Sequence, residues 1–260
     1  MSTLSISLLF LGAGYLLNIF FITVLYHRGL AHRAVTLRPG AIPWIAFLGN
    51  WLTGLDPKAW VCMHRLHHRY SDTAQDPHSP VHLGVLGVAP GQLFSYKKIV
   101  VRLLRKEPEV TALVEDLGFE VSWLNRKNLW FLPYLAHVAI GAVVGVLFSS
   151  WMIGVAYFLG IMSHPAQGWM VNALAHRFGY RNFDTEDNSR NNLLVGWLVF
   201  GEGFQNNHHA RPSSVRFSVR WWEIDLGYSL CVLASWVGLL SFPETPSKMS
   251  PKYSRSQLDL

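Results

Sequence analysis

Eight of the twelve histidines fall into four short clusters whose spacing suits metal binding. The clusters are HRGLAH, HRLHH, NALAH and QNNHH, and their histidines are His27, His32, His64, His67, His68, His176, His208 and His209. Imidazole is a ligand for iron, copper or zinc, and few carboxylates accompany it, which argues against calcium or magnesium. Eight imidazoles are more than one metal needs. The sequence therefore predicts a site for two transition-metal ions.

The second cluster has the clearest geometry. His64, His67 and His68 stand at positions i, i+3 and i+4, which places all three on one face of a helix. Adjacent His67 and His68 point about 100° apart, so such a pair can serve two metals at once. The same spacing recurs at Gln205, His208 and His209.

The first and third clusters differ in their spacing along a helix. His27 and His32 are five residues apart, which separates them by about 140° on a regular α-helix. They can converge only if the helix ends or is distorted between them, and Gly29 allows this. Asn172 and His176 are four apart, on one helix face at the end of an apolar stretch.

The elements that carry these clusters are apolar enough for a membrane. Residues 1–26 and 129–176 contain no Asp, Glu, Lys or Arg. Since a crossing takes about 20 residues, 4–26 predicts one span and 129–176 predicts two, with a turn near 149–150. Residues 1–26 lack a basic leader and a clear cleavage site, so we expect a retained anchor.

Charge placement predicts the orientation. All 22 Lys and Arg lie in residues 27–128 and 177–260, which the positive-inside tendency places in the cytoplasm, with the amino terminus outside. The apolar segment 41–55 is short for a span, and a crossing there would separate the first two clusters by about 30 Å. We therefore expect an all-α fold: an integral membrane helical stem of about three spans plus a membrane-dipping helix at 41–55, beneath a cytoplasmic helical cap.

The remaining organisation is simple. We expect one membrane-bound domain over residues 1–241 and a disordered tail over 242–260, which is rich in Ser and Pro. The topology explains the formal charge of +6, and we expect membrane lipids, not nucleic acid, as partners. His164 lies in the last predicted span, where a packing role is expected. The protein should be a multi-pass membrane protein, of the plasma membrane if the source is bacterial.

Four stretches of this chain resemble the fatty acid desaturase family, and most of all its acyl-CoA desaturase branch. They run in the family's order and form a very specific combination, and the resemblance covers most of the chain between residues 15 and 225. The stretches are HRGLAH, HRLHHRYSDTAQDPHSP, WMVNALAHRFG and GEGFQNNHHA.

The resemblance implies two irons in the cap and a bent tunnel for a long acyl chain. O2 would be the co-substrate, and the products would be a cis double bond and water. By matching position, the eight clustered histidines would bind iron and Asn172 would reach an iron through a water. Asp76 and His78 match a motif outside the metal ligands. An unactivated C–H bond has no acidity for a base to use, so a redox metal that activates O2 suits this reaction.

Three features depart from the family pattern. Gln205 stands where the third histidine box usually begins with His, and we expect an active site in which Gln205 binds iron or supports a ligand. A basic pair is missing after DPHSP, so acyl-CoA, acyl-lipid and acyl carrier protein all stay open as substrates. The basic residues that could replace this pair are Lys97, Lys98, Arg102, Arg105 and Lys106. With one span before the first cluster and no fused cytochrome b5 domain, electrons should come from a separate ferredoxin or cytochrome b5.

Two other functions are compatible with the same residues. A related di-iron lipid hydroxylase or oxygenase would use the same ligands, because the outcome depends on where the chain lies relative to the irons. A membrane metal-binding protein without redox chemistry is the alternative of another class. A transporter should carry polar ligands near the bilayer midplane, whereas these clusters lie at span ends and on cytoplasmic segments.

Overall fold

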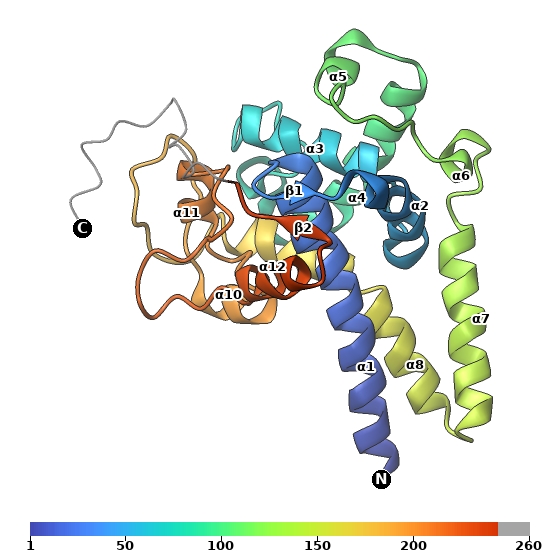
Figure 1. The fold of residues 1–260 in the computed structure, drawn as a ribbon. Coiled ribbons are helices and arrows are strands. Elements are labelled where there is room, and N and C mark those ends of the chain that lie inside the picture. The colour runs from blue at the N-terminus through green and yellow to red at the C-terminus, as the bar shows by residue number, and fades with distance from the viewer. Residues whose placement is uncertain (244–260) are drawn as a thin grey trace.

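The computed structural model describes residues 1–243, and within them the chain is mostly helical (Figure 1). All but the first two residues of the predicted tail, 242–260, lie outside the described residues. The helices are α1 (Thr3–Ile19), η1 (Phe20–Ala31), η2 (Pro39–Ala41), α2 (Ile42–Thr53), α3 (Pro57–Tyr70), α4 (Pro80–Leu104), α5 (Pro108–Ala112), α6 (Trp123–Arg126), α7 (Leu132–Leu147), α8 (Trp151–Ile161), α9 (His164–Trp169), η3 (Met170–Leu174), α10 (Leu193–Leu198), α11 (Gln205–Ala210) and α12 (Leu226–Trp236).

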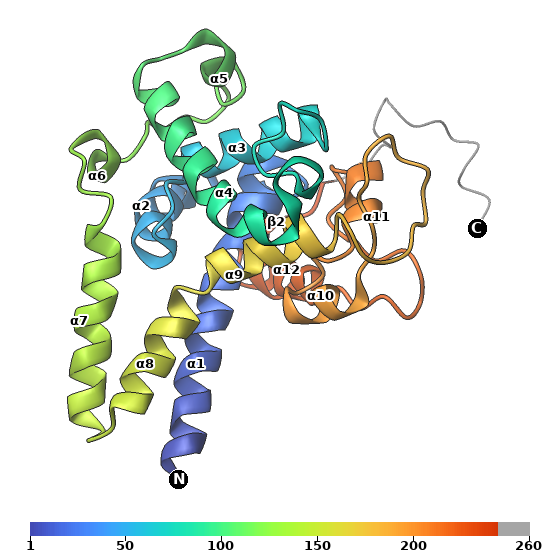
Figure 2. The same ribbon diagram turned by 180° about the vertical axis from the view of Figure 1, so that it is seen from behind.

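Helices α1, α7 and α8 form a stem that projects from a larger body (Figures 1 and 2). Helix α1 continues into η1, and together they make Thr3–Ala31, a 29-residue apolar helix. Within residues 1–243 it is the one helix long and apolar enough to cross a membrane. Helices α7 and α8 are apolar but shorter, and they are joined at Ser149, where the turn was predicted. The number of crossings therefore stays a prediction.

Glycines let the stem helices approach closely. A Cβ atom added to Gly14 of α1 would lie 2.7 Å from the backbone nitrogen of Ile161 in α8. A Cβ atom on Gly160 would lie 2.3 Å from the carbonyl oxygen of Leu11. Small residues at such contacts are typical of helix pairs in membranes. The outer faces of the stem helices expose large apolar side chains, among them Leu8 and Leu147.

The distortion expected between His27 and His32 is a π-helix. In η1 the backbone hydrogen bonds span five residues, and the amide of His32 donates to the carbonyl of His27 over 3.1 Å. Residues five apart therefore stack on one face, and the two imidazole rings lie 5.0 Å apart. The helix does not end at Gly29, whose hydrogen faces the Leu37 side chain, where a Cβ atom would be 2.8 Å away. A second π-helix, η3, precedes His176.

Helix α3 carries the second cluster and has strong signals at its start. Asp56 caps it by accepting a hydrogen bond from the Ala59 amide over 3.0 Å, and Pro57 occupies the first helical position. Helix α2, which forms where the membrane-dipping helix was predicted, ends at Gly54 with φ 72°. Its exposed face includes Trp44 and Phe47, a surface suited to lipid contact.

The fold is mostly helical, as expected, and one short strand pair was not predicted. Strand β1 (Thr36–Leu37) pairs antiparallel with β2 (Leu240–Ser241), with Thr36 opposite Ser241. The segment after η1 and the segment after α12 run side by side, and pairing satisfies their backbone amides and carbonyls. A two-residue strand is too short to leave an alternating pattern in the sequence.

Candidate metal centre

All eight clustered histidines meet inside the body, where η1, α3, η3 and α11 converge. In each of two groups, one nitrogen from every ring lies within 4.8 Å of the others. The five-histidine group contains His27, His32, His64, His68 and His208. The three-histidine group contains His67, His176 and His209. Both adjacent HH pairs divide between the two groups, which is the arrangement that two metals would require.

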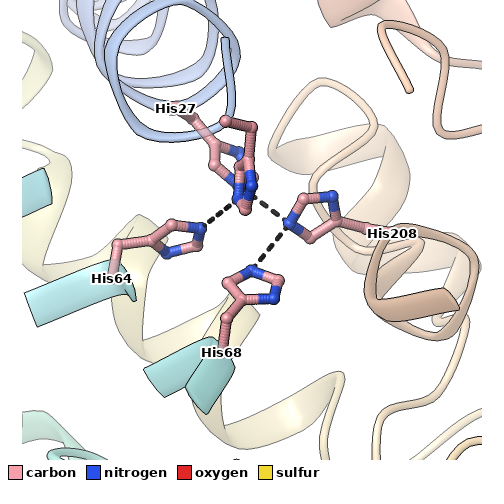
Figure 3. A group of neighbouring side chains, drawn as sticks. His27, His64, His68 and His208 are labelled. Atoms are coloured by element: carbon pink, nitrogen blue, oxygen red, sulfur yellow. Dashed lines mark hydrogen bonds between the residues drawn. The ribbon is translucent and has the colours of Figure 1, made fainter. Parts of the chain in front are cut away.

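Figure 3 shows His27, His64, His68 and His208 of the five-histidine group with their rings pointing toward one another. The Nε2 atom of His208 lies 3.0 Å from Nε2 of His27 and 3.0 Å from Nε2 of His68. The Nε2 atoms of His32 and His64 are 2.7 Å apart. A neutral imidazole has one N–H and one lone pair, so five converging rings cannot all pair with one another. A cation at the centre would turn the converging lone pairs into ligands.

Burial keeps most of these rings in the neutral form that binds metals. It lowers the pKa of His32, His64, His68 and His208 well below the ordinary value, and neighbouring imidazoles lower the pKa further. A metal ion competes with protons for imidazole nitrogens, so a low pKa favours metal binding near neutral pH.

The three-histidine group is braced by carboxylates on the opposite side of each ring. The Nδ1 atom of His67 lies 3.0 Å from Asp76, that of His176 lies 3.1 Å from Asp72, and that of His209 lies 2.6 Å from Asp187. Each contact holds the proton on Nδ1 and leaves Nε2 as an acceptor. All three Nε2 atoms are buried, and within residues 1–243 none has a hydrogen-bond partner. Buried polar atoms without partners are rare, and a metal ion would satisfy these three.

The bracing carboxylates stay ionised despite their burial. Burial opposes the charge on Asp72, but His176 and Ser79 lower its pKa to about 2. Burial opposes the charge on Asp187 as well, and His209 lowers the pKa of that carboxyl far below the ordinary value. For the ring of His67, burial lowers the pKa, but Asp76, Asp72 and Asp187 together raise it above the ordinary value. Each carboxylate thus holds its imidazole by charge as well as by hydrogen bonding.

Glu202 braces the five-histidine group in the same way. Its Oε2 atom lies 2.6 Å from Nδ1 of His27, and its Oε1 atom accepts a hydrogen bond from Arg28 over 2.8 Å. Arg28 is fully buried and also pairs with Asp225 over 3.0 Å. The ring of His27 is therefore fixed by a buried chain of charges that reaches α12.

Sequence reasoning missed three of these four carboxylates. Asp72 lies four residues after His68 and Glu202 three before Gln205, so proximity to a cluster was an available signal for both. Asp187 lies eleven residues beyond His176 in an irregular loop, and no spacing rule connects them. Asp76 was expected outside the metal ligands, and it lies against Nδ1 of His67.

His78 lies close to the three-histidine group without belonging to it. Its ring stacks against that of His67 with centroids 4.6 Å apart, and its backbone amide donates to Asp76 over 3.0 Å. Burial lowers the pKa of His78 to about 3. In the described part of the chain both of its ring nitrogens are unpartnered, and His67, Asp76 and His78 form a third set of clustered ligand atoms.

Gln205 and Asn172 lie in the same region. Within residues 1–243, the hydrogen bonds that their side-chain amides donate go to groups other than histidine nitrogens. The Nε2 atom of Gln205 donates to the carbonyl of Glu202 over 2.7 Å. The Nδ2 atom of Asn172 donates to Gln92 over 3.4 Å. Both residues line a cavity that also borders His27.

The two asparagines of QNNHH position the short helix α11. The Asn206 side-chain oxygen accepts from the Asn182 and Phe183 amides, each over 2.8 Å. Asn207 donates to the Phe217 carbonyl over 2.8 Å. A six-residue helix is too short to be stable by itself, so these buried bonds are what orient His208 and His209.

The cavity runs along the five-histidine group and is largely apolar. Trp60 stacks on His64 with ring centroids 5.1 Å apart and forms part of the wall. Among the other wall residues are Ile22, Leu55, Met63, Leu93, Val171 and Val199. His164, expected to pack, is buried and lines the cavity. This shape and polarity suit an alkyl chain passing beside a metal site.

Buried histidine groups beside an apolar cavity, on a helical body with an apolar stem, are what a membrane-associated metal enzyme acting on an apolar chain requires. Comparison with known proteins gives the family. Residues 5–231 match the family described as "Fatty acid desaturase". The chain therefore belongs to this family and is an oxidoreductase of the acyl desaturase type. The match confirms the resemblance that its histidine boxes indicated.

Two relatives show how far the similarity extends. The chain is 33% identical over 232 residues to "Acyl-CoA C20 Delta5-desaturase" of Anemone leveillei, covering 89% of this chain and 72% of that protein. It is 30% identical over 237 residues to "Delta-9 acyl-lipid desaturase 1" of Arabidopsis thaliana, covering 87% and 72%. Relatives named as desaturases favour that function over a non-enzymatic metal-binding role.

Proposed function

We propose that this chain is an O2-dependent desaturase that binds one iron at each histidine group and introduces a cis double bond into a long acyl chain. The observation that carries the proposal is the division of both HH pairs between two groups that lie beside an apolar cavity. Neither a single-metal site nor a purely structural role for the histidines would need this division.

In this proposal the chain's own residues do three things. The eight histidines are the metal ligands, and Asp72, Asp76, Asp187 and Glu202 hold their rings in the correct tautomer and orientation. The bound irons would supply the O2 activation that unactivated C–H bonds require. The apolar wall, including Trp60, excludes water and fixes which methylenes lie beside the five-histidine group.

The polar carrier of the acyl chain stays outside the cavity. Relatives are named for acyl-CoA and for acyl-lipid substrates, and we propose one of these two carriers for this chain. Of the basic residues that could hold a phosphate, Arg102 already pairs with Glu107 over 2.6 Å and Glu109 over 2.5 Å. The exposed candidates on and after α4 are Lys97, Lys98, Arg105 and Lys106. A separate ferredoxin or cytochrome b5 would deliver the electrons.

We place the stem in the membrane with three crossings and the body in the cytoplasm. The apolar helix Thr3–Ala31 and the exposed apolar side chains of α7 and α8 support this topology. The basic blocks 27–128 and 177–260 support the orientation.

Product analysis tests the function. The chain would be expressed with an electron donor in a host that cannot desaturate, and its lipid acyl chains analysed by gas chromatography–mass spectrometry after derivatisation of double bonds. We expect a new monoenoic chain that is absent when His67→Ala is expressed, because that change removes a ligand from the three-histidine group. A hydroxylated chain would instead establish the oxygenase alternative. Equal product from the His67→Ala variant would refute the proposed site.

A further inference from the structure

Helix α10 (Leu193–Leu198) has one face packed against the stem. Val195 and Val199 are buried and form a small core with Ile19 of α1. Met170 and Leu174 of the last predicted span pack against the same core. These contacts fix which side of α10 faces the protein and which faces outward.

The outward side of α10 is entirely apolar. Leu194 is 66% exposed and Trp197 54% exposed, and Leu193 and Leu198 are exposed beside them. Residues 193–200 contain no charged side chain. A helix on a water-facing surface would carry polar residues on this side, so the exposed face needs an apolar partner.

The position of α10 along the stem indicates that partner. The hydroxyl of Tyr15 in α1 donates a hydrogen bond to the carbonyl of Leu198, and the rings of Tyr15 and Phe200 lie 6.4 Å apart. Tyr15 is twelve residues beyond Thr3, about 18 Å along an α-helix, whereas the hydrocarbon core of a bilayer is about 30 Å thick. If α1 enters the bilayer near Thr3, the end of α10 lies alongside a segment still inside it. Both ribbon views show α10 at the edge of the body nearest the stem (Figures 1 and 2).

The loop between α11 and α12 carries residues typical of a membrane interface. Trp221 is 89% exposed, and the guanidinium of Arg220 lies 5.8 Å from the Trp222 ring. Tryptophan gathers at the level of lipid headgroups, and a neighbouring arginine can meet the phosphates.

We propose that α10 is an interfacial membrane helix whose Leu194 and Trp197 insert among the acyl chains of the cytoplasmic leaflet. The phospholipid bilayer is the partner of this face. The helix would then attach the body to the membrane on the side of α1 opposite to α2 (Figures 1 and 2). This inference rests on the proposal that α1 crosses the membrane, and the test below separates the two.

Site-directed fluorescence in liposomes tests the proposal. Leu194→Cys would carry an environment-sensitive fluorophore, with Leu8→Cys on the exposed face of α1 as the membrane reference and Ala112→Cys on α5 as the aqueous reference. The two native cysteines, Cys62 and Cys231, are fully buried, so labelling should be selective for the new thiol. The full-length protein would be reconstituted in phosphatidylcholine liposomes containing nitroxide-bearing lipid.

The label on Leu194→Cys should behave like that on Leu8→Cys: quenched several-fold more by nitroxide lipid than the Ala112→Cys label, and shielded from aqueous iodide. If the Leu8→Cys label is quenched by lipid while the Leu194→Cys label responds only to iodide, α10 is not in the membrane although α1 crosses it. If neither is quenched by lipid, the proposed topology fails first. A disulfide that joins two chains of unlabelled Leu194→Cys protein under mild oxidation, together with no lipid quenching of the labelled protein, would overturn the proposal in favour of a second copy.

Discussion

At the scale of single residues, carboxylate contacts at Nδ1 mark four of the eight clustered histidines. Four of the rings have a carboxylate within 3.1 Å on that side, so their Nε2 atoms are directed into the site with the lone pair available. A histidine that only fills space, such as His137, instead uses both nitrogens, here with Tyr157 and the Trp51 carbonyl.

Asp187→Asn should weaken metal binding without removing a ligand. Asp187 lies 2.6 Å from Nδ1 of His209, and the loss of such a partner typically costs about 10- to 100-fold in metal affinity or activity. The measurement is iron retained after dialysis against a graded chelator. Asp184→Asn, an exposed position in the same loop, is the matched control and should retain iron as the unchanged protein does. Equal retention by both variants would show that Asp187 does not support the site.

Gln205→His should preserve iron binding. The amide of Gln205 is buried and donates to the Glu202 carbonyl over 2.7 Å, a bond that an imidazole N–H can also make. Iron content per chain, measured by elemental mass spectrometry, should be unchanged within error. Loss of iron in this variant would mean that the glutamine amide has a dedicated role.

The sequence predicted which histidines come together better than it predicted the carboxylates that contact them. All eight clustered histidines come together. This was predictable because their spacing in the sequence shows which of them share a helix face. Asp187 and Glu202 reach the rings through tertiary contacts across 22 and 175 residues, since they bind His209 and His27. No local period records a contact of that kind.

At the scale of elements, the two π-helices are the least predictable feature. Residues 20–31 are mostly apolar, so the distortion was indicated only by the five-residue spacing of His27 and His32 and by Gly29 between them. The wider π-helical turn places the rings of His27 and His32 on the same side of η1. The predicted spans at 129–176 appear as several short helices because Ser163 and Pro165 interrupt the last one.

Gly14→Leu should destabilise the stem. A Cβ atom at this position meets the backbone of Ile161 at 2.7 Å, and overpacking of this kind costs about 1–3 kcal/mol. Thermal unfolding in detergent, followed by fluorescence-detected gel filtration, should show a lower midpoint. Gly12→Leu on the same helix is the control, because a Cβ atom there has nothing within 4 Å. Equal midpoints for the two variants would contradict the close α1–α8 contact.

At the scale of the whole molecule, the proposed topology places the free end of the stem outside the cell and the body in the cytoplasm. Thr3 lies at the far end of the stem and Ala112 on the opposite side of the body, as Figure 1 shows for α1 and α5. A thiol reagent that cannot cross membranes should label Thr3→Cys in intact cells and Ala112→Cys only after the cells are opened. The reverse pattern would place the body outside and contradict the positive-inside prediction.

The central claim is that the two histidine groups each hold one iron. The direct measurement is metal content per chain by elemental mass spectrometry, with Mössbauer spectroscopy on iron-57-enriched protein to establish that the irons form a coupled pair. The account predicts close to two irons in the purified protein and a clear loss in His176→Ala, which removes one of the three ligands of the smaller group. Stoichiometric zinc in place of iron, or a single iron that His176→Ala leaves in place, would contradict it.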